Sequence, residues 1–246
     1  MVVAGAMNIV FILLWFIPLY FISALIHELG HIVVQLRYGW KLHLLVVGLI
    51  GIRRNDADRL TLYFEKNPSM WGGAMFAFPT KESENNIKVF SKSLLGGPIA
   101  SIILGVISLL SAIIFFYETH QLLTLGLMSI VMGVVCFLPL KDTFTYTDGK
   151  RWRRIRDGGQ GKAEEIALFK IVEHGQLKNK NETLQKEDFE VLLTAKLSSH
   201  RYYGYYYLYL YYASKNDNEN KEMALNVLQS MKKDVPKMIV DECKID

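Results

Sequence analysis

The stretch LIHELGHIV, Leu25 to Val33, places two histidines and one glutamate inside an otherwise apolar run. An ionisable side chain in hydrocarbon is costly, so its presence there indicates a functional site. On a helix, His27 and His31 lie on one face, one turn apart. Two imidazoles at that spacing can bind one zinc ion, and Glu28 beside them is placed to accept a proton from water. Gly30, within the motif, leaves room for another backbone to come close.

The surrounding sequence is typical of a membrane protein. Three runs contain no charged residue and have about the ~20 residues that a helix needs to cross a bilayer: Ile9–Ile26, Leu94–Tyr117 and Leu122–Leu140. We therefore predict a mainly α, polytopic membrane protein with spans at about 8–36, 94–117 and 121–140. No Lys or Arg precedes the first run, which is also longer than the apolar part of a signal peptide. We expect this run to be retained as a span.

Basic residues are distributed unevenly along the chain. None precedes Arg37 and none lies in the ETHQ turn between the second and third runs, whereas they fill the Arg37–Lys92 connection and the segment Lys150–Arg156. The positive-inside rule then predicts an N-terminus outside the cell membrane and both basic regions in the cytoplasm. The net charge of +4 reflects this topology, so we expect no nucleic-acid partner.

Residues 40–78 do not match a further span. Their apolar run, Leu42–Ile52, is too short to cross the bilayer and is rich in Val, Ile and Gly. This composition predicts a short, membrane-associated β region, either separate strands or a hairpin. Strands in Leu42–Ile52 would be able to pair with a substrate peptide and hold it extended.

The character of the sequence changes after Asp157, where a glycine-rich break precedes soluble, helix-like patterns. We predict two domains, a transmembrane core at 1–156 and a soluble, cytoplasmic helical domain at 157–246. Helices are expected over four segments: 163–175, 186–197, 200–215 and 220–234. In the third, tyrosines occupy two helical faces, namely Tyr202, Tyr205, Tyr209 and Tyr212 on one, and Tyr203 and Tyr207 on the other. This pattern predicts a helix packed on both sides, and the alternative is a peptide-binding groove.

A catalytic zinc site usually has three protein ligands and one open position. The first and third spans both run inward, so the third ligand should lie near the cytoplasmic end of the third. Asp148 follows that span at a suitable depth, and Asp142, nearer its end, is the rival. Glu65 and His43 in the intervening connection are further alternatives.

Three motifs resemble those of the site-2 protease family of intramembrane zinc metalloproteases: HELGH in the first run, GGPIAS opening the second and LPLKDTFTYTDGKR closing the third. In that family a three-helix core carries a two-histidine, a Gly-Pro and an Asp-Gly motif in this order. The resemblance covers about Ile9 to Arg156. It implies that His27, His31 and Asp148 are zinc ligands and that Glu28 is the catalytic base. It also implies that residues 40–78 are the family's membrane-associated β-hairpin region.

The resemblance further implies a set of substrate-binding residues: Gly97, Pro98, Ser101 and Cys136. Family members usually have asparagine at the position of Ser101 and commonly at that of Cys136, so substrate handling is expected to differ in this chain. The second cysteine, Cys243, lies far along the sequence, and two thiols so placed form neither a disulfide framework nor a metal knuckle.

These features predict an intramembrane zinc metalloprotease that hydrolyses a membrane-embedded regulator, or a peptide precursor such as that of a pheromone or bacteriocin. The alternative is a non-catalytic, metal-binding membrane protein acting in peptide transport or immunity, although such a site would not need Glu28. A further alternative leaves both histidines buried without a metal. The expected partners are the bilayer, the substrate and a cytoplasmic partner of the C-terminal helices.

Overall fold

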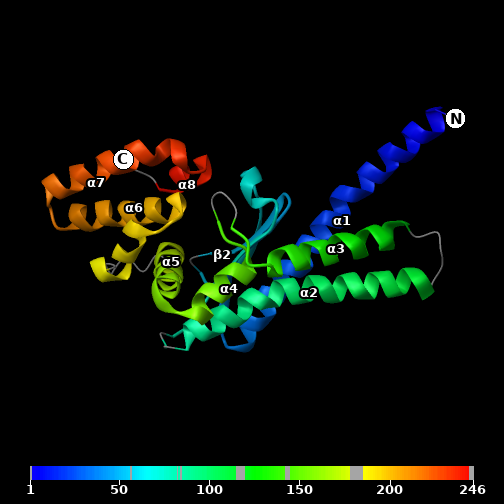
Figure 1. The fold of residues 1–246 in the computed structure, drawn as a ribbon, viewed down its shortest axis with the longest axis horizontal. Helices are drawn as coiled ribbons and strands as arrows, with labels where there is room; N and C mark the ends of the chain where they lie inside the picture. Colours follow the sequence, from blue (N-terminus) through cyan, green and yellow to red (C-terminus); the bar gives the residue numbers. More distant parts are fainter. Residues whose placement is uncertain are drawn as a thin grey trace. The chain divides into compact units, whose positions relative to one another are not determined.

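The computed structural model describes residues 2–55, 57–81, 83, 85–114, 120–141, 145–177 and 185–243. The chain forms two compact units, Met1–Leu138 and Pro139–Asp246. The first unit holds three long helices and a small sheet, and the second is helical (Figure 1). The sequence predicts a domain boundary after residue 156, whereas the segment 139–156 packs with the second compact unit.

The three long helices of the first unit are α1 (Val2–Arg37), α2 (Asn86–Ile114) and α3 (His120–Phe137). Within the described residues, three helices are long and apolar enough to cross a membrane: Trp15–Arg37, Asn86–Ile114 and His120–Phe137. The three predicted apolar helices are thereby confirmed. Helix α2 begins before the apolar run at Leu94, because the polar segment NIKVFSKS continues the same helix toward its N-terminus.

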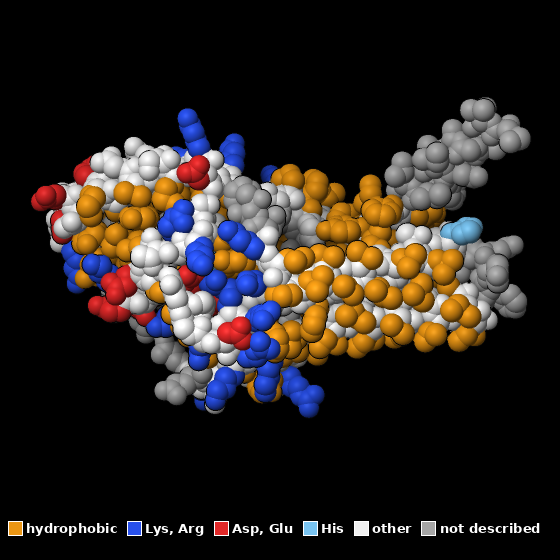
Figure 2. All heavy atoms as spheres, viewed as in Figure 1, with side chains coloured by type: hydrophobic (Ala, Val, Ile, Leu, Met, Phe, Trp, Pro, Cys, Tyr) orange, Lys and Arg blue, Asp and Glu red, His pale blue; other side chains and the backbone are white. Residues whose placement is uncertain are grey.

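Apolar side chains cover the outside of this helical bundle (Figure 2). On α2 and α3, for example, Ile113 is 74% exposed and Val131 is 60% exposed. Small and polar residues lie inside instead, including Ser108 and Ser129, which are 4% and 0% exposed. This arrangement suits a bundle surrounded by lipid, where helices associate through small residues and hydrogen bonds and not through the hydrophobic effect.

Glycines bring the helices into backbone contact. A Cβ on Gly30 would lie 2.3 Å from the carbonyl oxygen of Gly96, so the backbones of α1 and α2 meet at these two glycines. A Cβ on Gly105 would lie 2.8 Å from the carbonyl oxygen of Gly126, which gives α2 and α3 a similar crossing. The expectation that Gly30 admits a second backbone is therefore confirmed.

The β region is a four-stranded antiparallel sheet of β1 (Lys41–Val47), β2 (Ile50–Arg54), β3 (Leu60–Phe64) and β4 (Ala74–Phe78). A 3-10 turn, η1 (Pro68–Met70), lies between β3 and β4. The predicted strands are confirmed, but they form a sheet of order β3-β2-β1-β4 and not a single hairpin. Both strands within Leu42–Ile52 are interior strands, so the prediction that this stretch pairs with substrate is wrong. The edges available for pairing belong to β3 and β4.

The second unit consists of helices and 3-10 turns: α4 (Asp148–Asp157), α5 (Gly159–Leu177), η2 (Lys186–Asp188), η3 (Glu190–Thr194), α6 (Ser198–Ser214), α7 (Asn218–Met231), η4 (Lys232–Asp234) and α8 (Lys237–Glu242). The predicted α-helix over 186–197 is wrong, because this segment forms the 3-10 turns η2 and η3. Phe189, Leu192 and Ala195 are at most 1% exposed and recur every third residue. A 3-10 helix has three residues per turn and therefore places all three on the same side, toward the core.

Helix α6 packs on both sides, as its tyrosines predict. Leu208 belongs to one buried cluster with Phe189 and Leu192, whereas Tyr202 belongs to another with Leu228 and other C-terminal residues. Several further tyrosines of α6 are only partly buried and contact these clusters from the side.

Buried charges tie α4 to α5. Glu165 is 0% exposed and accepts hydrogen bonds from Arg151 Nε (2.9 Å) and Arg154 Nε (3.0 Å). Arg154 also donates to Glu164, which is 3% exposed. His200 of α6 completes the group, with Nδ1 3.6 Å from Glu164 Oε2. Because removing one partner of such a group leaves an uncompensated buried charge, these residues fix α4 on α5.

Candidate metal centre

Polar side chains follow one face of α1 at intervals of four residues: Ser23, His27, His31 and Gln35. All four are buried, with exposed fractions between 0% and 7%. His27, His31 and Gln35 face small and polar residues of α2, which recur at the same interval, namely Ser93, Gly97 and Ser101. Ser23 Oγ lies 2.6 Å from Ser129 Oγ of α3 instead. The two helices therefore form a narrow polar interior in which the histidines lie.

His31 is held in one tautomer by the backbone of α2. Its Nδ1 lies 2.7 Å from the carbonyl oxygen of Ser93. A carbonyl oxygen can only accept, so Nδ1 must carry the proton, and in the neutral ring the lone pair is then on Nε2. Gln35, one turn further along α1, donates to Ser93 Oγ (3.0 Å) and secures the same turn of α2.

His27 is held by a side chain of α2. Its Nδ1 lies 3.0 Å from Ser101 Oγ, a buried hydroxyl that is able to accept the imidazole proton. The Nε2 atoms of both histidines converge beside Gly97, where a Cβ would lie 2.3 Å from that of His31 and 2.8 Å from that of His27. Gly97 therefore leaves open the space in which both lone pairs meet. Pro98, which follows it, has no N–H to offer the carbonyl of Leu94, so the helical hydrogen-bond pattern is interrupted at this level.

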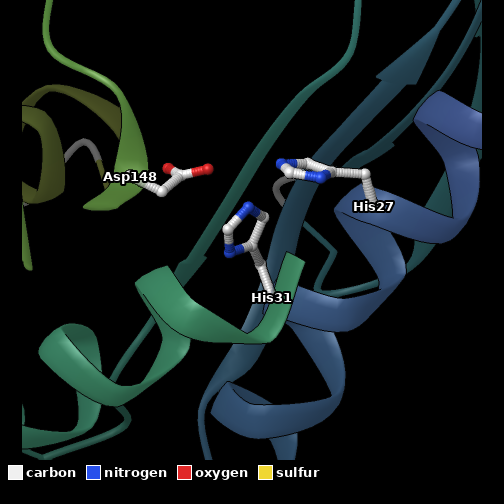
Figure 3. Close-up of side chains that lie close together, drawn as sticks. All are labelled: His27, His31 and Asp148. Atoms are coloured by element: carbon white, nitrogen blue, oxygen red, sulfur yellow. The ribbon is translucent and has the colours of Figure 1, made fainter. Parts of the chain in front are cut away.

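Asp148 is the first residue of α4 and is partly buried. The loop before it closes on itself, because Leu140 N donates to Thr147 Oγ1 (3.1 Å) and Thr147 N donates to Leu140 O (3.3 Å). Asp148 offers a carboxylate oxygen, and His27 and His31 each offer one ring nitrogen. These three ligand atoms all lie within 4.8 Å of one another (Figure 3).

The other candidates for a third ligand do not join this group. Asp142 lies outside the described residues. Glu65 accepts from Tyr63 Oη (2.8 Å) and from Asn67 N (2.8 Å) at the end of β3. Burial, together with this hydrogen bond to Glu65, raises the pKa of Tyr63 to about 12. Among the described residues, the cluster of His, Cys, Asp and Glu side chains able to share a cation contains neither Glu65 nor His43.

His43 and Cys136 have different surroundings. His43 is a residue of β1 and contacts the ring of Phe78, with 5.3 Å between ring centroids. Burial and the nearby Arg54 lower the pKa of His43. Cys136 is a partly buried thiol near the end of α3. It also lies outside the group of cation-binding side chains found in the described part of the chain.

The contact made by Ser101 adds to the role that the sequence predicts for it. This serine was expected to contact substrate, and its hydroxyl is engaged by His27 and so helps to orient a candidate ligand. Two further residues with such a role, Ser93 and Gln35, were not predicted. The signal for them was the interval of four residues at which polar and small side chains recur within the apolar runs.

Glu28 lies on a different face of α1 from the two histidines and is partly buried. On that side it adjoins the turn before β4, where a Cβ on Gly73 would lie 2.6 Å from Glu28 Oε1. The glutamate therefore approaches the sheet, whereas the imidazoles approach α2.

The donor set fits zinc. Two neutral imidazoles and one carboxylate are among the three-ligand sets found at catalytic zinc sites, which keep a fourth position open. Imidazole ligands of zinc generally donate their second ring N–H to a carbonyl, carboxylate or water, and His31 donates in this way to Ser93.

Comparison with protein families matches residues 15–243, nearly the whole chain, to peptidase family M50. The chain belongs to this family. Peptidase family M50 is the site-2 protease family, whose members are zinc-dependent membrane metalloproteases. The resemblance seen in the three motifs is thereby confirmed, and the match continues beyond Arg156 through the helical second unit. Neither the comparison with curated proteins nor that with solved structures gives a match.

Proposed function

We propose that this chain hydrolyses a peptide bond of a membrane-embedded regulator or of a membrane-associated peptide precursor. In this proposal His27, His31 and Asp148 are the zinc ligands and Glu28 is the general base. One observation carries it: both imidazoles are engaged through Nδ1, and both Nε2 atoms converge on the space beside Gly97. The glutamate that follows the first histidine supports catalysis, because a purely structural site would not need it.

The chemistry is shared between the metal and the chain. When bound, zinc polarises the scissile carbonyl and lowers the pKa of water to about 7. Glu28 accepts the proton that the attacking water loses and passes it to the nitrogen of the leaving amine. Ser93 and Ser101 keep the imidazole rings in one orientation while this happens.

Substrate would be held at the sheet. A peptide bond within a helix is protected by its own hydrogen bonds, so the segment to be cut has to be extended. The β4 edge is the nearer candidate for strand addition, since β4 directly follows Gly73, which adjoins Glu28. An apolar groove of about 650 Å³ on the same side of α1, lined by Phe21, Leu25 and residues of β1 and β2, suits the side chains of a membrane-derived peptide.

The proposed topology has the N-terminus outside and the second unit in the cytoplasm. The distribution of Lys and Arg supports it, because these residues flank the inner ends of the spans and are absent from the ETHQ turn. In this arrangement the C-terminal helices are available to a cytoplasmic partner.

Metal content and cleavage, measured together, test the proposal. The purified protein and its Glu28→Gln variant are reconstituted with epitope-tagged single-span proteins and with small peptides encoded by neighbouring genes. Wild-type protein should bind one zinc ion and cut at least one of these candidate substrates. Glu28→Gln should keep the zinc and lose cleavage by a factor of roughly 10²–10⁴. Zinc binding without any cleavage, or cleavage unaffected by Glu28→Gln, would contradict the proposal.

A further inference from the structure

The turn at residues 71–73 lies against Glu28. A Cβ on Gly73 would stand 2.6 Å from Glu28 Oε1 and 3.3 Å from both Cγ and Cδ. Gly73 has a φ of +116°, a conformation that glycine alone adopts readily. The carboxylate of Glu28 thus occupies the space in which any side chain at position 73 would lie.

This turn is tethered to the elements around it. Gly48 N, in the turn between β1 and β2, donates to Trp71 O (2.9 Å), and Trp71 Nε1 donates to Glu65 O (3.1 Å). From α1, Tyr20 Oη donates to Gly72 O (3.3 Å). Three hydrogen bonds to separate elements fix the backbone of this turn beside α1.

We infer that Gly73 is a positioning residue for the proposed base, and this inference rests on the proposed function. A glutamate side chain has three rotatable bonds, and close packing against a fixed backbone limits the positions that its carboxylate can take. Displacing a catalytic group by about 1 Å can cost roughly 10²-fold in rate. Gly73 sets that position without contributing a side chain of its own.

Substitution of Gly73 by alanine tests the inference. Gly73→Ala should lower kcat by about 10²-fold for a reporter substrate that the wild type cuts, with KM and bound zinc unchanged. The matched control is Gly39→Ala, because Gly39 also has a positive φ, +79°, but a Cβ there would meet nothing within 4 Å. This control should retain near-wild-type kcat. An equal loss of kcat in both variants would overturn the inference.

A double-mutant cycle separates contact with Glu28 from backbone strain. Glu28→Asp shortens the side chain and withdraws the carboxylate from position 73, whereas the strain at φ +116° is the same in both backgrounds. In the Glu28→Asp background, Gly73→Ala should lower kcat by no more than about threefold. A similar loss in both backgrounds would show that strain alone is responsible and would overturn the inference. Glu28→Gln, measured in parallel, reports on the proposed function separately. Continued cleavage by this variant would refute the assignment of Glu28 as the general base, but not the contact between Gly73 and Glu28.

If Gly73→Ala does not fold, Tyr20→Phe provides the test. It removes the hydroxyl that tethers Gly72 and adds no atom near Glu28. A lower kcat at unchanged zinc content and melting temperature supports the inference. An unchanged kcat overturns it.

Discussion

At the scale of single residues, the interface between α1 and α2 brings two histidines of α1 together with the residues of α2 that hold them. His27 and His31 were predictable because the HELGH motif has the spacing of two ligands on one helical face. Ser93 was not predicted, because an isolated serine in an apolar run is common and carries no motif, whereas Ser101 was predicted from the GGPIAS motif but as a substrate-binding residue. Recurrence of small and polar residues every four positions, in both helices, was the available signal. Gly73 could not be found in this way, since its importance depends on a contact across the fold.

Ser101→Ala should weaken zinc binding. It removes the hydroxyl at 3.0 Å from His27 Nδ1, and loss of such a partner typically lowers metal affinity by about 10–100-fold. Excess zinc should restore cleavage, and competition with a chelator measures the affinity. Ser108→Ala is the control, because Ser108 is also buried on α2. Equal zinc affinities in the two variants would argue against an orienting role for Ser101.

At the scale of elements, sequence patterns predicted which segments form helices and strands better than how they pair. The residue composition of 40–78 predicted strands, but the order β3-β2-β1-β4 depends on pairings between distant segments. The 3-10 turns at 186–194 were mistaken for an α-helix because an apolar residue every third position also fits a helical face roughly. The segment also packs closely on Gly204 of α6, where a Cβ would lie 2.9 Å from Leu192 Cβ, and such a contact is not visible in the local sequence.

Proline substitutions on β4 should separate substrate pairing from folding. Along an edge strand, neighbouring residues direct their N–H groups alternately toward the sheet and away from it. Of Met75→Pro and Phe76→Pro, one therefore removes a bond to β1 and lowers the melting temperature. The other keeps the melting temperature and the zinc but removes an outward donor, so cleavage should slow. Wild-type cleavage by this thermally stable variant would exclude strand addition at β4.

The buried group around α4 and α5 should make stability depend on pH. Burial lowers the pKa of His200 below its ordinary value of 6.5, while Glu164 and Glu165 oppose the shift and Arg151 and Arg154 reinforce it. The unfolded chain therefore binds this proton more readily, so stability is lost as the pH falls below about 6.5. Thermal unfolding at pH 5.5 and 7.5 should show a lower melting temperature at the lower pH. His200→Gln should reduce that difference, and an unaltered difference would contradict this assignment.

For the whole molecule, hydropathy was the most informative property of the sequence. Runs without charge identified three helices able to cross a membrane, because a helix needs about 20 apolar residues to do so. The division into units was less predictable. Asp148 belongs to the last of the three sequence motifs, yet α4 packs in the helical unit through Arg151 and Arg154.

Labelling of single cysteines tests the proposed topology. In a background of Cys136→Ser and Cys243→Ser, one cysteine is introduced at His120, which begins α3, or at the exposed Lys81. A membrane-impermeant maleimide should label the former in intact cells and the latter only after permeabilisation. The reverse pattern would invert the topology.

Gly30 lies between the two histidines, so the place where α1 and α2 interlock is also the place where the imidazoles are held. Separating these helices would break the hydrogen bonds that hold both histidines on α2. Entry of substrate between α1 and α2 would therefore disrupt the candidate metal site. The opposite flank of α1 meets the sheet across the apolar groove, where side chains can swing without disturbing the interlocked backbones. A peptide arriving from the bilayer thus has its least disruptive route along the sheet, on which it would reach Glu28, the proposed base, before the two histidines.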